Sequence, residues 1–244
     1  MPIAKTNIPK LLAKPVGRAF ADFGMIKPDD KVLLAVSGGK DSLSLLYILR
    51  YFLIASPVKF SLGIVTIDPQ VEGFEPQALE SFFKQFDLPY FFEEFPIMEA
   101  AKEKMSGKSY CSFCARIKRG LMYKVARREG YNVLALGQHL DDLCESLLMS
   151  MCHNGKMKTM KAHYINDVKD LRIIRPLVYV RERQLADFAQ KLDLPVIADS
   201  CPACFAKPTE RVHFKKLLLN EEKRSPHLYS NLLSAMKPLL NEVD

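Results

Sequence analysis

A six-residue segment, Ser37-Gly-Gly-Lys-Asp-Ser42, carries the strongest chemical signal in the sequence. It follows a continuous apolar run, residues 31–36, that is typical of a buried parallel strand, and a helical apolar pattern, residues 43–52, comes after it. Two glycines let the backbone turn tightly so that N–H groups converge, and the start of a helix adds partial positive charge. With two hydroxyl groups and one ammonium group, this segment would form a cradle for phosphates; the alternative is an ordinary Gly-Gly turn. The residues of the cradle are Ser37, Gly38, Gly39, Lys40, Asp41 and Ser42.

Cysteines offer a second kind of chemistry. Four of the six form two C-x-x-C pairs, Cys111/Cys114 and Cys201/Cys204, and in a reducing compartment such pairs indicate metal or redox ligands. Because 86 residues separate Cys114 from Cys201, the fold rather than a local ribbon must bring the pairs together. The alternatives are a structural four-cysteine zinc site, an iron–sulfur cluster, and a thioredoxin-type redox pair at Cys201-Pro-Ala-Cys204.

Alternating strand and helix patterns predict the scaffold for these residues. We expect an α/β protein with a doubly wound, mostly parallel sheet and flanking helices. In such a sheet a ligand binds beyond the carboxyl ends of the strands, here at residues 37–42, 67–69 and 137–142. Asp141 or Asp142 could cap the helix that follows, orient Mg²⁺ on phosphates, or do both. The further nucleotide ligands expected at these strand ends are Asp68, Gly137, Asp141 and Asp142.

Three segments are expected along the chain. They are an N-terminal helical segment (residues 1–30), a central domain with both candidate sites (31–204), and a C-terminal helical segment packed on it (205–244). Within the central domain the patterns predict helices at 77–86, 97–105, 114–129, 141–151 and 182–192, and strands at 62–68, 90–93, 132–137, 171–174 and 195–197. Cys144 and Cys152, eight residues apart in an apolar helical pattern, are predicted to be core thiols.

Composition favours a soluble globular protein. Of the 244 residues, 48% are hydrophobic and 26% are charged. The longest apolar stretch, residues 43–55, is interrupted by Arg50 and is too short to span a bilayer, so no membrane association is expected. No apolar leader pattern is found at the start of the sequence, and we therefore expect a cytoplasmic protein.

Charge is distributed unevenly along the chain. A formal net charge of +7 and a pI near 9.0 permit a polyanionic partner. Residues 101–131 contain nine basic and two acidic side chains, and residues 154–185 contain eight basic and three acidic ones, whereas residues 71–100 contain seven acidic and one basic. Solvated helix faces would explain each block alone, but two basic blocks beside a candidate phosphate site favour a nucleic-acid partner.

The phosphate cradle after a strand resembles the signature of the PP-loop ATP pyrophosphatases; a Walker A loop is excluded because Asp41 follows Lys40. Further motifs make the sequence similar to the tRNA 2-thiocytidine synthetase family, from about residue 17 to about residue 237. In chain order these motifs are Asp22-Phe-Gly-Met-Ile26, Cys111-Ser-Phe-Cys114-Ala-Arg116, Asn154-Gly-Lys-Met-Lys158, Ile174-Arg-Pro-Leu177, Arg181-Glu182 and the second C-x-x-C pair. Two positions depart from the family pattern: Gln138 stands where a histidine is usual, and the stretch before Cys201 is longer.

The resemblance implies a PP-loop (adenine nucleotide alpha hydrolase-like) fold and a tRNA-cytidine 2-sulfurtransferase activity. ATP, with Mg²⁺, would be cleaved to AMP and pyrophosphate while it adenylates the 2-oxygen of a cytidine at position 32 of the tRNA anticodon loop. The resemblance also implies that Cys111, Cys114 and Cys201 are catalytic and hold a [4Fe-4S] cluster whose fourth iron carries an exogenous sulfide. Cys204 would lie nearby without being a ligand. No cysteine lies outside residues 111–204, which favours the cytidine branch over related uridine-thiolating enzymes.

By the same resemblance, tRNA is the macromolecular partner. Its phosphates are expected to bind Arg116, Lys118, Arg119, Lys156 and Lys158. A cysteine desulfurase or free sulfide would donate sulfur, and the family pattern suggests a homodimer. The alternatives are a PP-loop enzyme that thiolates another tRNA base, a PP-loop ligase that acts on a small carboxylate, and a zinc-bound RNA-binding protein without catalytic activity.

Overall fold

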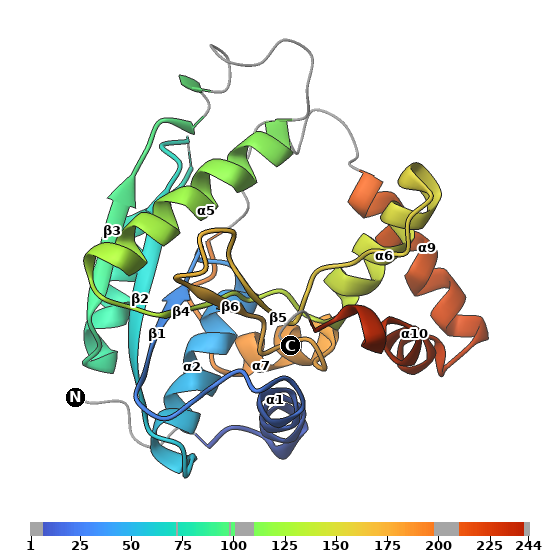
Figure 1. Ribbon diagram of the computed structural model, residues 1–244, viewed down its shortest axis with the longest axis horizontal. Coiled ribbons are helices and arrows are strands. Elements are labelled where there is room, and N and C mark those ends of the chain that lie inside the picture. The colour runs from blue at the N-terminus through green and yellow to red at the C-terminus, as the bar shows by residue number, and fades with distance from the viewer. Residues whose placement is uncertain (1–6, 72, 98, 101–109, 198–209, 242–244) are drawn as a thin grey trace.

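The computed structural model describes residues 7–71, 73–97, 99–100, 110–197 and 210–241. Its centre is a six-stranded sheet with the strand order β3-β2-β1-β4-β6-β5 (Figure 1). All neighbouring strands are parallel except β5, which runs antiparallel to β6. The strands are β1 (Asp30–Ala35), β2 (Phe60–Asp68), β3 (Tyr90–Glu94), β4 (Val133–Ala135), β5 (His163–Ile165) and β6 (Arg172–Ile174). This sheet confirms the predicted α/β class.

Helices cover both faces of the sheet, because β1 is apolar on both sides. Val32 and Leu34 belong to one hydrophobic cluster, whereas Leu33 between them belongs to the other. Helix α5 covers the face of Leu33, and most of the other helices contribute to the larger cluster on the opposite face. The helices are α1 (Lys10–Phe23), α2 (Lys40–Ala55), α3 (Pro76–Phe83), η1 (Lys84–Phe86), α5 (Tyr110–Arg128), α6 (Leu140–Asn154), α7 (Glu182–Lys191), α9 (Glu210–Arg224), α10 (Leu228–Met236) and η2 (Lys237–Leu239).

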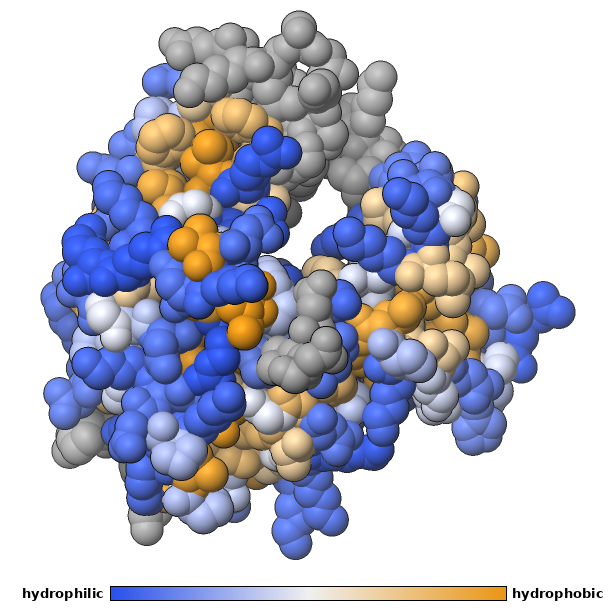
Figure 2. Space-filling view, viewed as in Figure 1, coloured by the Kyte–Doolittle hydropathy of each residue, from blue (hydrophilic) through white to orange (hydrophobic). Residues whose placement is uncertain are grey.

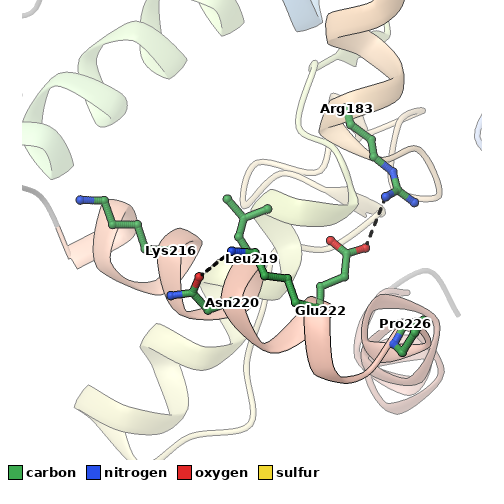
Figure 3. Close-up of a pocket in the computed structure, with 7 residues that line it drawn as sticks. Arg183, Lys216, Leu219, Asn220, Glu222 and Pro226 are labelled. Carbon is green, nitrogen blue, oxygen red and sulfur yellow. Dashed lines mark hydrogen bonds and ion pairs between the residues drawn. The ribbon is translucent and has the colours of Figure 1, made fainter.

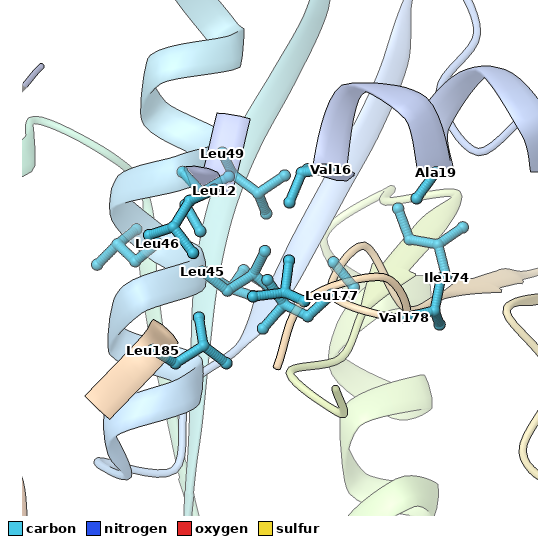
Figure 4. Packing of buried hydrophobic residues seen from close by; sticks show 14 of the residues in the cluster. Leu12, Val16, Ala19, Leu45, Leu46, Leu49, Ile174, Leu177, Val178 and Leu185 are labelled. Atoms are coloured by element: carbon cyan, nitrogen blue, oxygen red, sulfur yellow. The ribbon is translucent and has the colours of Figure 1, made fainter. Parts of the chain in front are cut away.

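Helix α2 is the most deeply buried helix next to the sheet, and it carries the phosphate cradle at its start. Its Leu45, Leu46 and Leu49 are completely buried. In Figure 4 they lie among Val16 of α1 and Leu177 of the segment before α7. Burial of each such leucine stabilises the fold by roughly 1.5–3 kcal/mol relative to exposure. The apolar contacts therefore fix where the first turn of α2 lies relative to β1.

The C-terminal helices pack on α6, away from the sheet (Figure 1). Phe214 and Leu218 of α9 and Tyr229 of α10 are buried there. The backbone N–H of Ala162, just before β5, donates to the Leu240 carbonyl oxygen at 2.7 Å, so the end of the chain returns to the sheet. The expected boundary after residue 204 falls outside the described residues. Within the described ranges, none of the helices combines the length and hydropathy that a bilayer span requires.

Two strand predictions differ from the structure. The strand expected at residues 195–197 is wrong: this segment is irregular, and the Ile197 N–H donates to the Gly38 carbonyl oxygen at 3.0 Å. Residues 195–197 therefore contact the phosphate cradle and do not join the sheet. Strand β5 was not predicted, because His163-Tyr-Ile165 lies among polar residues and does not form a continuous apolar run. The helix expected at residues 97–105 lies largely outside the described residues.

The two cysteines of α6 have different surroundings. Cys144 is completely buried, as predicted, and burial raises the pKa of its thiol to about 12. The prediction for Cys152 is wrong, because this thiol is exposed. Eight residues turn an α-helix by more than two full turns, so that the second cysteine lies past the buried face near the end of α6.

Gly63 in the centre of β2 tests how tightly the α5 face is packed. A methyl group there would overlap the hydroxyl group and ring of Tyr131, which also packs on Phe91. We expect Gly63→Ala to lower the free energy of unfolding by about 1–3 kcal/mol. Gly120→Ala is the matched control, since no atom lies within 4 Å of its added methyl group in α5 and alanine favours helix. Urea unfolding checks both; equal effects of the two substitutions would contradict the packing.

Candidate active site

The first turn of α2 is prepared to bind an anion. The Ser37 N–H donates to Ser42 Oγ at 3.3 Å, and Ser42 Oγ donates to the Gly39 carbonyl oxygen at 2.9 Å, so the loop closes on itself. Gly38 has φ +84°, a conformation that glycine adopts without strain. No side chain caps the amino terminus of α2 at Gly39. Its first backbone N–H groups are therefore available to phosphate oxygens.

The loop between β4 and α6 packs directly on this turn. A methyl group at Gly137 would lie 3.3 Å from both the backbone nitrogen and Cα of Ser42, so glycine permits the close approach. His139 then begins α6 with a reciprocal cap: its N–H donates to Asp142 Oδ2 at 3.1 Å, and the Asp142 N–H donates to His139 Nδ1 at 3.4 Å. The structure thus brings together the segments that follow β1 and β4, residues 37–42 and 137–142, as the sequence predicts.

Lys40 lies between two carboxylates. Its Nζ is 3.1 Å from Asp41 Oδ2 and 2.9 Å from Glu182 Oε1, and Glu182 Oε2 is 2.6 Å from Lys215 Nζ of α9. Burial alone would lower the pKa of Lys40, but the charges of Asp41 and Glu182 raise it. Burial would likewise raise the pKa of Glu182, but hydrogen bonds from Lys215 and Lys40 bring it down to about 2. Lys40 and Glu182 are therefore both ionised at neutral pH.

Asp141 holds α6 and α7 together. Its carboxylate is buried, lies 3.2 Å from Arg181 Nε through both oxygens, and accepts the Glu182 N–H at 2.8 Å. Arg181 also reaches Glu222 of α9 at 2.7 Å and stacks over the Tyr229 ring, 3.2 Å from its centroid. Protein donors therefore already occupy both Asp141 oxygens. These contacts orient the loop between β4 and α6 relative to the start of α7.

Asp41 supplies the oxygen best suited to a metal ion. Its Oδ1 is buried and has no hydrogen-bond partner among the described residues. Burial raises the pKa of Asp41, while His139 and Lys40 oppose the shift. A buried, unpaired carboxylate oxygen is costly, and it is the kind of ligand that Mg²⁺ prefers. No group of three or more metal-binding side chains occurs in the described part of the chain. Mg²⁺ would fit here only with phosphate oxygens completing its coordination.

Asp68 lies at the carboxyl end of β2, next to β1 in the sheet. Its Oδ1 accepts the Gln70 N–H at 2.7 Å, and Gln70 has φ +53°. Asp68 thus shapes the turn after β2. Its place at the same edge as the phosphate cradle agrees with the sequence prediction, and a role in nucleotide binding stays a prediction.

The first cysteine pair lies at the start of α5. Cys111 and Cys114 both fall within its first turns. Cys114 is half-buried and is not in a disulfide. The C-x-x-C spacing itself is typical of two ligands of one metal centre. Cys201 and Cys204 lie outside the described residues.

The predicted RNA-binding residues lie on two surfaces near the carboxyl edge of the sheet. Arg116 and Arg119 of α5 are exposed and Lys118 is half-buried, whereas Lys156 and Lys158, just past α6, are exposed. Figure 1 shows the start of α5 and the end of α6 toward this same edge. Figure 2 shows hydrophilic side chains over much of this face. The arrangement leaves their cationic groups accessible to an RNA backbone.

A cavity of about 790 Å³ lies between α7 and α9, outside the phosphate cradle (Figure 3). Arg183 and Glu222 approach each other there at 3.7 Å, and Lys216 and Lys223 of α9 also line it. Because Glu222 is already paired with Arg181, the remaining charge in this cavity is positive.

Known proteins resemble the chain over nearly its full length. Residues 5–211 match the PP-loop domain. The tRNA-cytidine(32) 2-sulfurtransferase of Geobacter sulfurreducens is 42% identical over 228 residues, or 93% of this chain and 89% of that protein. This chain belongs to that family of PP-loop proteins. The PP-loop protein of the same name from Syntrophotalea carbinolica is 36% identical over 237 residues, or 97% and 92% of the two chains.

Solved structures confirm the PP-loop fold. The U34-tRNA thiolase NcsA from Methanococcus maripaludis, solved with its [4Fe-4S] cluster, matches with a TM-score of 0.78 at 22% identity over 96% of this chain and 80% of that one. The NH₃-dependent NAD synthetase from Campylobacter jejuni matches with a TM-score of 0.51 at 18% identity, over 96% and 97% of the chains. These likenesses show a common fold.

Several residues around the PP-loop were not predicted. Arg181 and Glu182 belong to a family motif. Their partners Lys215 and Glu222 lie in a C-terminal region whose sequence predicts helices and marks no site residue. Glu145 could have been found from its helical spacing, since it lies one turn beyond Asp141 on α6.

Substitution of Lys40 tests whether the charge of its ammonium group contributes to ATP binding by the PP-loop. Lys40→Met retains the aliphatic stem and removes the ammonium group, while Glu182 stays paired with Lys215. We expect ATP to bind at least about 10-fold more weakly by calorimetry, a loss of ~1.4 kcal/mol. Lys216→Met, on the exposed face of α9, is the control and should bind ATP like the wild type. Equal affinities of the wild type and Lys40→Met would rule out this role.

Glu145 makes stability depend on pH. Burial, and then repulsion by Asp142, raise its pKa to about 7 against the pull of Arg211. Between the unfolded and folded pKa values the native state binds the extra proton, so stability falls as pH rises through 7. We expect Glu145→Gln to be more stable than the wild type by on the order of 2–3 kcal/mol at pH 8, and nearly equal to it at pH 5.

Urea unfolding at both pH values measures this difference. Glu221→Gln, at a half-exposed position of α9, should show little difference at either pH. A stability gap between Glu145→Gln and the wild type that stays constant from pH 5 to pH 8 would contradict the assignment.

Proposed function

We propose that this protein is an ATP-dependent tRNA sulfurtransferase that makes 2-thiocytidine at position 32 of tRNA. The observation that carries the proposal is the 42% identity over 93% of the chain to a protein named for this activity. The site supports it, because an intact phosphate cradle and a C-x-x-C pair at a helix start occur in the same chain.

The proposed reaction has two steps. The cytidine 2-oxygen attacks the α-phosphorus of ATP, so that a C–O–P linkage forms and pyrophosphate leaves. Sulfide then adds at C2, and AMP departs with the former 2-oxygen. Sulfur enters and leaves at the sulfide oxidation level, so neither step needs an oxidant or a reductant.

The PP-loop performs the binding work of the first step. The free N–H groups at the start of α2 and the Lys40 ammonium would hold the phosphates, and Asp41 Oδ1 would share a Mg²⁺ with them. Because Lys40 is paired with Asp41 and Glu182, the incoming phosphates must take over at least one of these contacts. Lys215 can keep Glu182 neutralised during the exchange.

We assign a [4Fe-4S] cluster to Cys111, Cys114 and Cys201. When bound, such a cluster supplies an iron without a protein ligand, where sulfide can be held. The first two ligands form a C-x-x-C pair at the start of α5, and the third ligand follows from the family motif alone. Zinc at the same cysteines would give a colourless protein, and this distinguishes the two metals.

The tRNA would lie across the two basic surfaces. Arg116, Lys118 and Arg119 of α5, with Lys156 and Lys158 after α6, would contact its phosphates. An anticodon-loop base is single-stranded and can be turned into a site without breaking a duplex. A cysteine desulfurase or free sulfide as the donor, a homodimer, and a cytoplasmic location complete the proposal.

The competing functions differ in their products. Thiolation of another base would give 2-thiouridine, and a small-carboxylate ligase would release AMP without any change to tRNA. The direct experiment incubates anaerobically purified protein with ATP, Mg²⁺, sulfide and tRNA, followed by nucleoside mass spectrometry. It should yield 2-thiocytidine together with AMP and pyrophosphate.

Cysteine variants test the cluster assignment. Cys111→Ala and Cys114→Ala should each abolish 2-thiocytidine formation and remove the brown iron–sulfur absorption, while ATP affinity stays unchanged. Cys152→Ala, at the exposed cysteine of α6, is the matched control and should retain both colour and product. Full thiolation by Cys114→Ala would overturn the assignment.

A further inference from the structure

Arg175 is a buried cation without an acidic partner. It directly follows β6 and is 7% exposed, yet no carboxylate pairs with it among the described residues. Its Nε donates to Gln138 Oε1 at 2.9 Å and its Nη1 donates to the Lys161 carbonyl oxygen at 2.5 Å. The guanidinium carbon also lies 5.6 Å from the centroid of the Tyr164 ring. These contacts hold the guanidinium from three sides.

This arrangement fixes the orientation of the Gln138 amide. An arginine can only donate hydrogen bonds, so the group that faces it must be the amide oxygen. The amide NH₂ is then turned away from Arg175, and it has no acceptor among the residues that the structure describes. Gln138 is half-buried, so its amide NH₂ is a pre-oriented donor that an incoming ligand can reach.

Gln138 lies beside the PP-loop. The residue before it, Gly137, packs on the Ser42 backbone, and the residue after it, His139, places Nε2 3.8 Å from Asp41 Oδ2. A base whose 2-oxygen attacks the α-phosphorus must come to this same place. The ring nitrogen N3 is bonded to the reacting C2, so a side chain next to the reacting edge meets N3.

We propose that Gln138 is the residue that distinguishes cytosine from uracil, and that Arg175 positions it. This inference rests on the proposed function. Cytosine N3 is an acceptor that can pair with the free amide NH₂ of Gln138. Uracil carries a hydrogen on N3, so its donor would face a donor and both would lose their partners. A site built around one hydrogen bond strongly rejects the analogue that cannot make it.

Reversing the polarity of residue 138 tests the proposal. Gln138→Glu retains size, gains an ion pair with Arg175, and presents a carboxylate oxygen that accepts from uracil N3–H. The assay compares thiolation of two tRNAs that differ only in C or U at position 32, with product identity by mass spectrometry. We expect the ratio of cytidine to uridine thiolation to fall at least about 10-fold. Gln138→Leu should lose cytidine activity without gaining uridine activity.

Two further variants separate discrimination from folding. Gln190→Glu makes the same change on the exposed face of α7 and should leave the ratio unaltered. Arg175→Lys lacks the planar guanidinium that is held from three sides, so it should orient the Gln138 amide less strictly and lower the ratio. An unchanged ratio in Gln138→Glu, with a wild type that thiolates C32, overturns the inference and leaves the function intact. Absence of 2-thiocytidine from the wild-type reaction overturns both.

Discussion

The placement of Lys40 between Asp41 and Glu182 is the interaction on which the rest of the site depends. A half-buried ammonium group is stabilised by compensating charge, and the two carboxylates supply it. Glu182 in turn requires Lys215, which ties α9 to the start of α7. The C-terminal helices are thus joined to the nucleotide site by charge as well as by apolar packing on α6. Lys40 is thus linked to α9 through the shared carboxylate of Glu182.

The same constraint explains how the site can accept a highly charged nucleotide. Asp41 and Glu182 already pair with Lys40, the cation that would bind phosphate. Phosphate binding therefore replaces one anion by another at Lys40, and the net charge buried there changes little. Asp41 Oδ1 is buried and has no hydrogen-bond partner among the described residues. A metal ion that arrives with the phosphates would bind this oxygen and remove the cost of leaving it unpaired. Asp141 and Arg181 are fully engaged with each other and keep the loops fixed during this exchange.

Much of the fold follows from local patterns in the sequence. The continuous apolar runs of β1 and β2 and the helical spacing of α2 and α6 need no tertiary information, and the parallel topology then places residues 37–42 and 137–142 at one edge. The structures of strand β5 and of the irregular segment 195–197 could not be predicted, because their own residues carry no clear pattern and backbone partners from distant segments decide their structure. The prediction that Cys152 is buried was wrong, because apolar spacing alone does not show at which residue a helix extends beyond the hydrophobic core.

The contacts between distant residues around the site are the least predictable from sequence. Arg175 and Gln138 are 37 residues apart, and their pairing depends on β4 and β6 being neighbours. Lys215 and Glu222 reach the site only because α9 folds back over α6. Pairs of this kind depend on tertiary packing, and neither composition nor spacing marks them. The cysteine pairs show the converse: their spacing in the sequence indicates metal chemistry without showing how the fold joins them.

The central claim is that the PP-loop activates the cytidine 2-oxygen by transferring AMP to it. It is tested most directly with tRNA that carries ¹⁸O at the 2-position of cytidine 32, in a reaction with ATP, Mg²⁺ and sulfide. We expect one ¹⁸O atom in the phosphate of each AMP released for each 2-thiocytidine formed. AMP without the label, or label recovered in water while 2-thiocytidine accumulates, would contradict it.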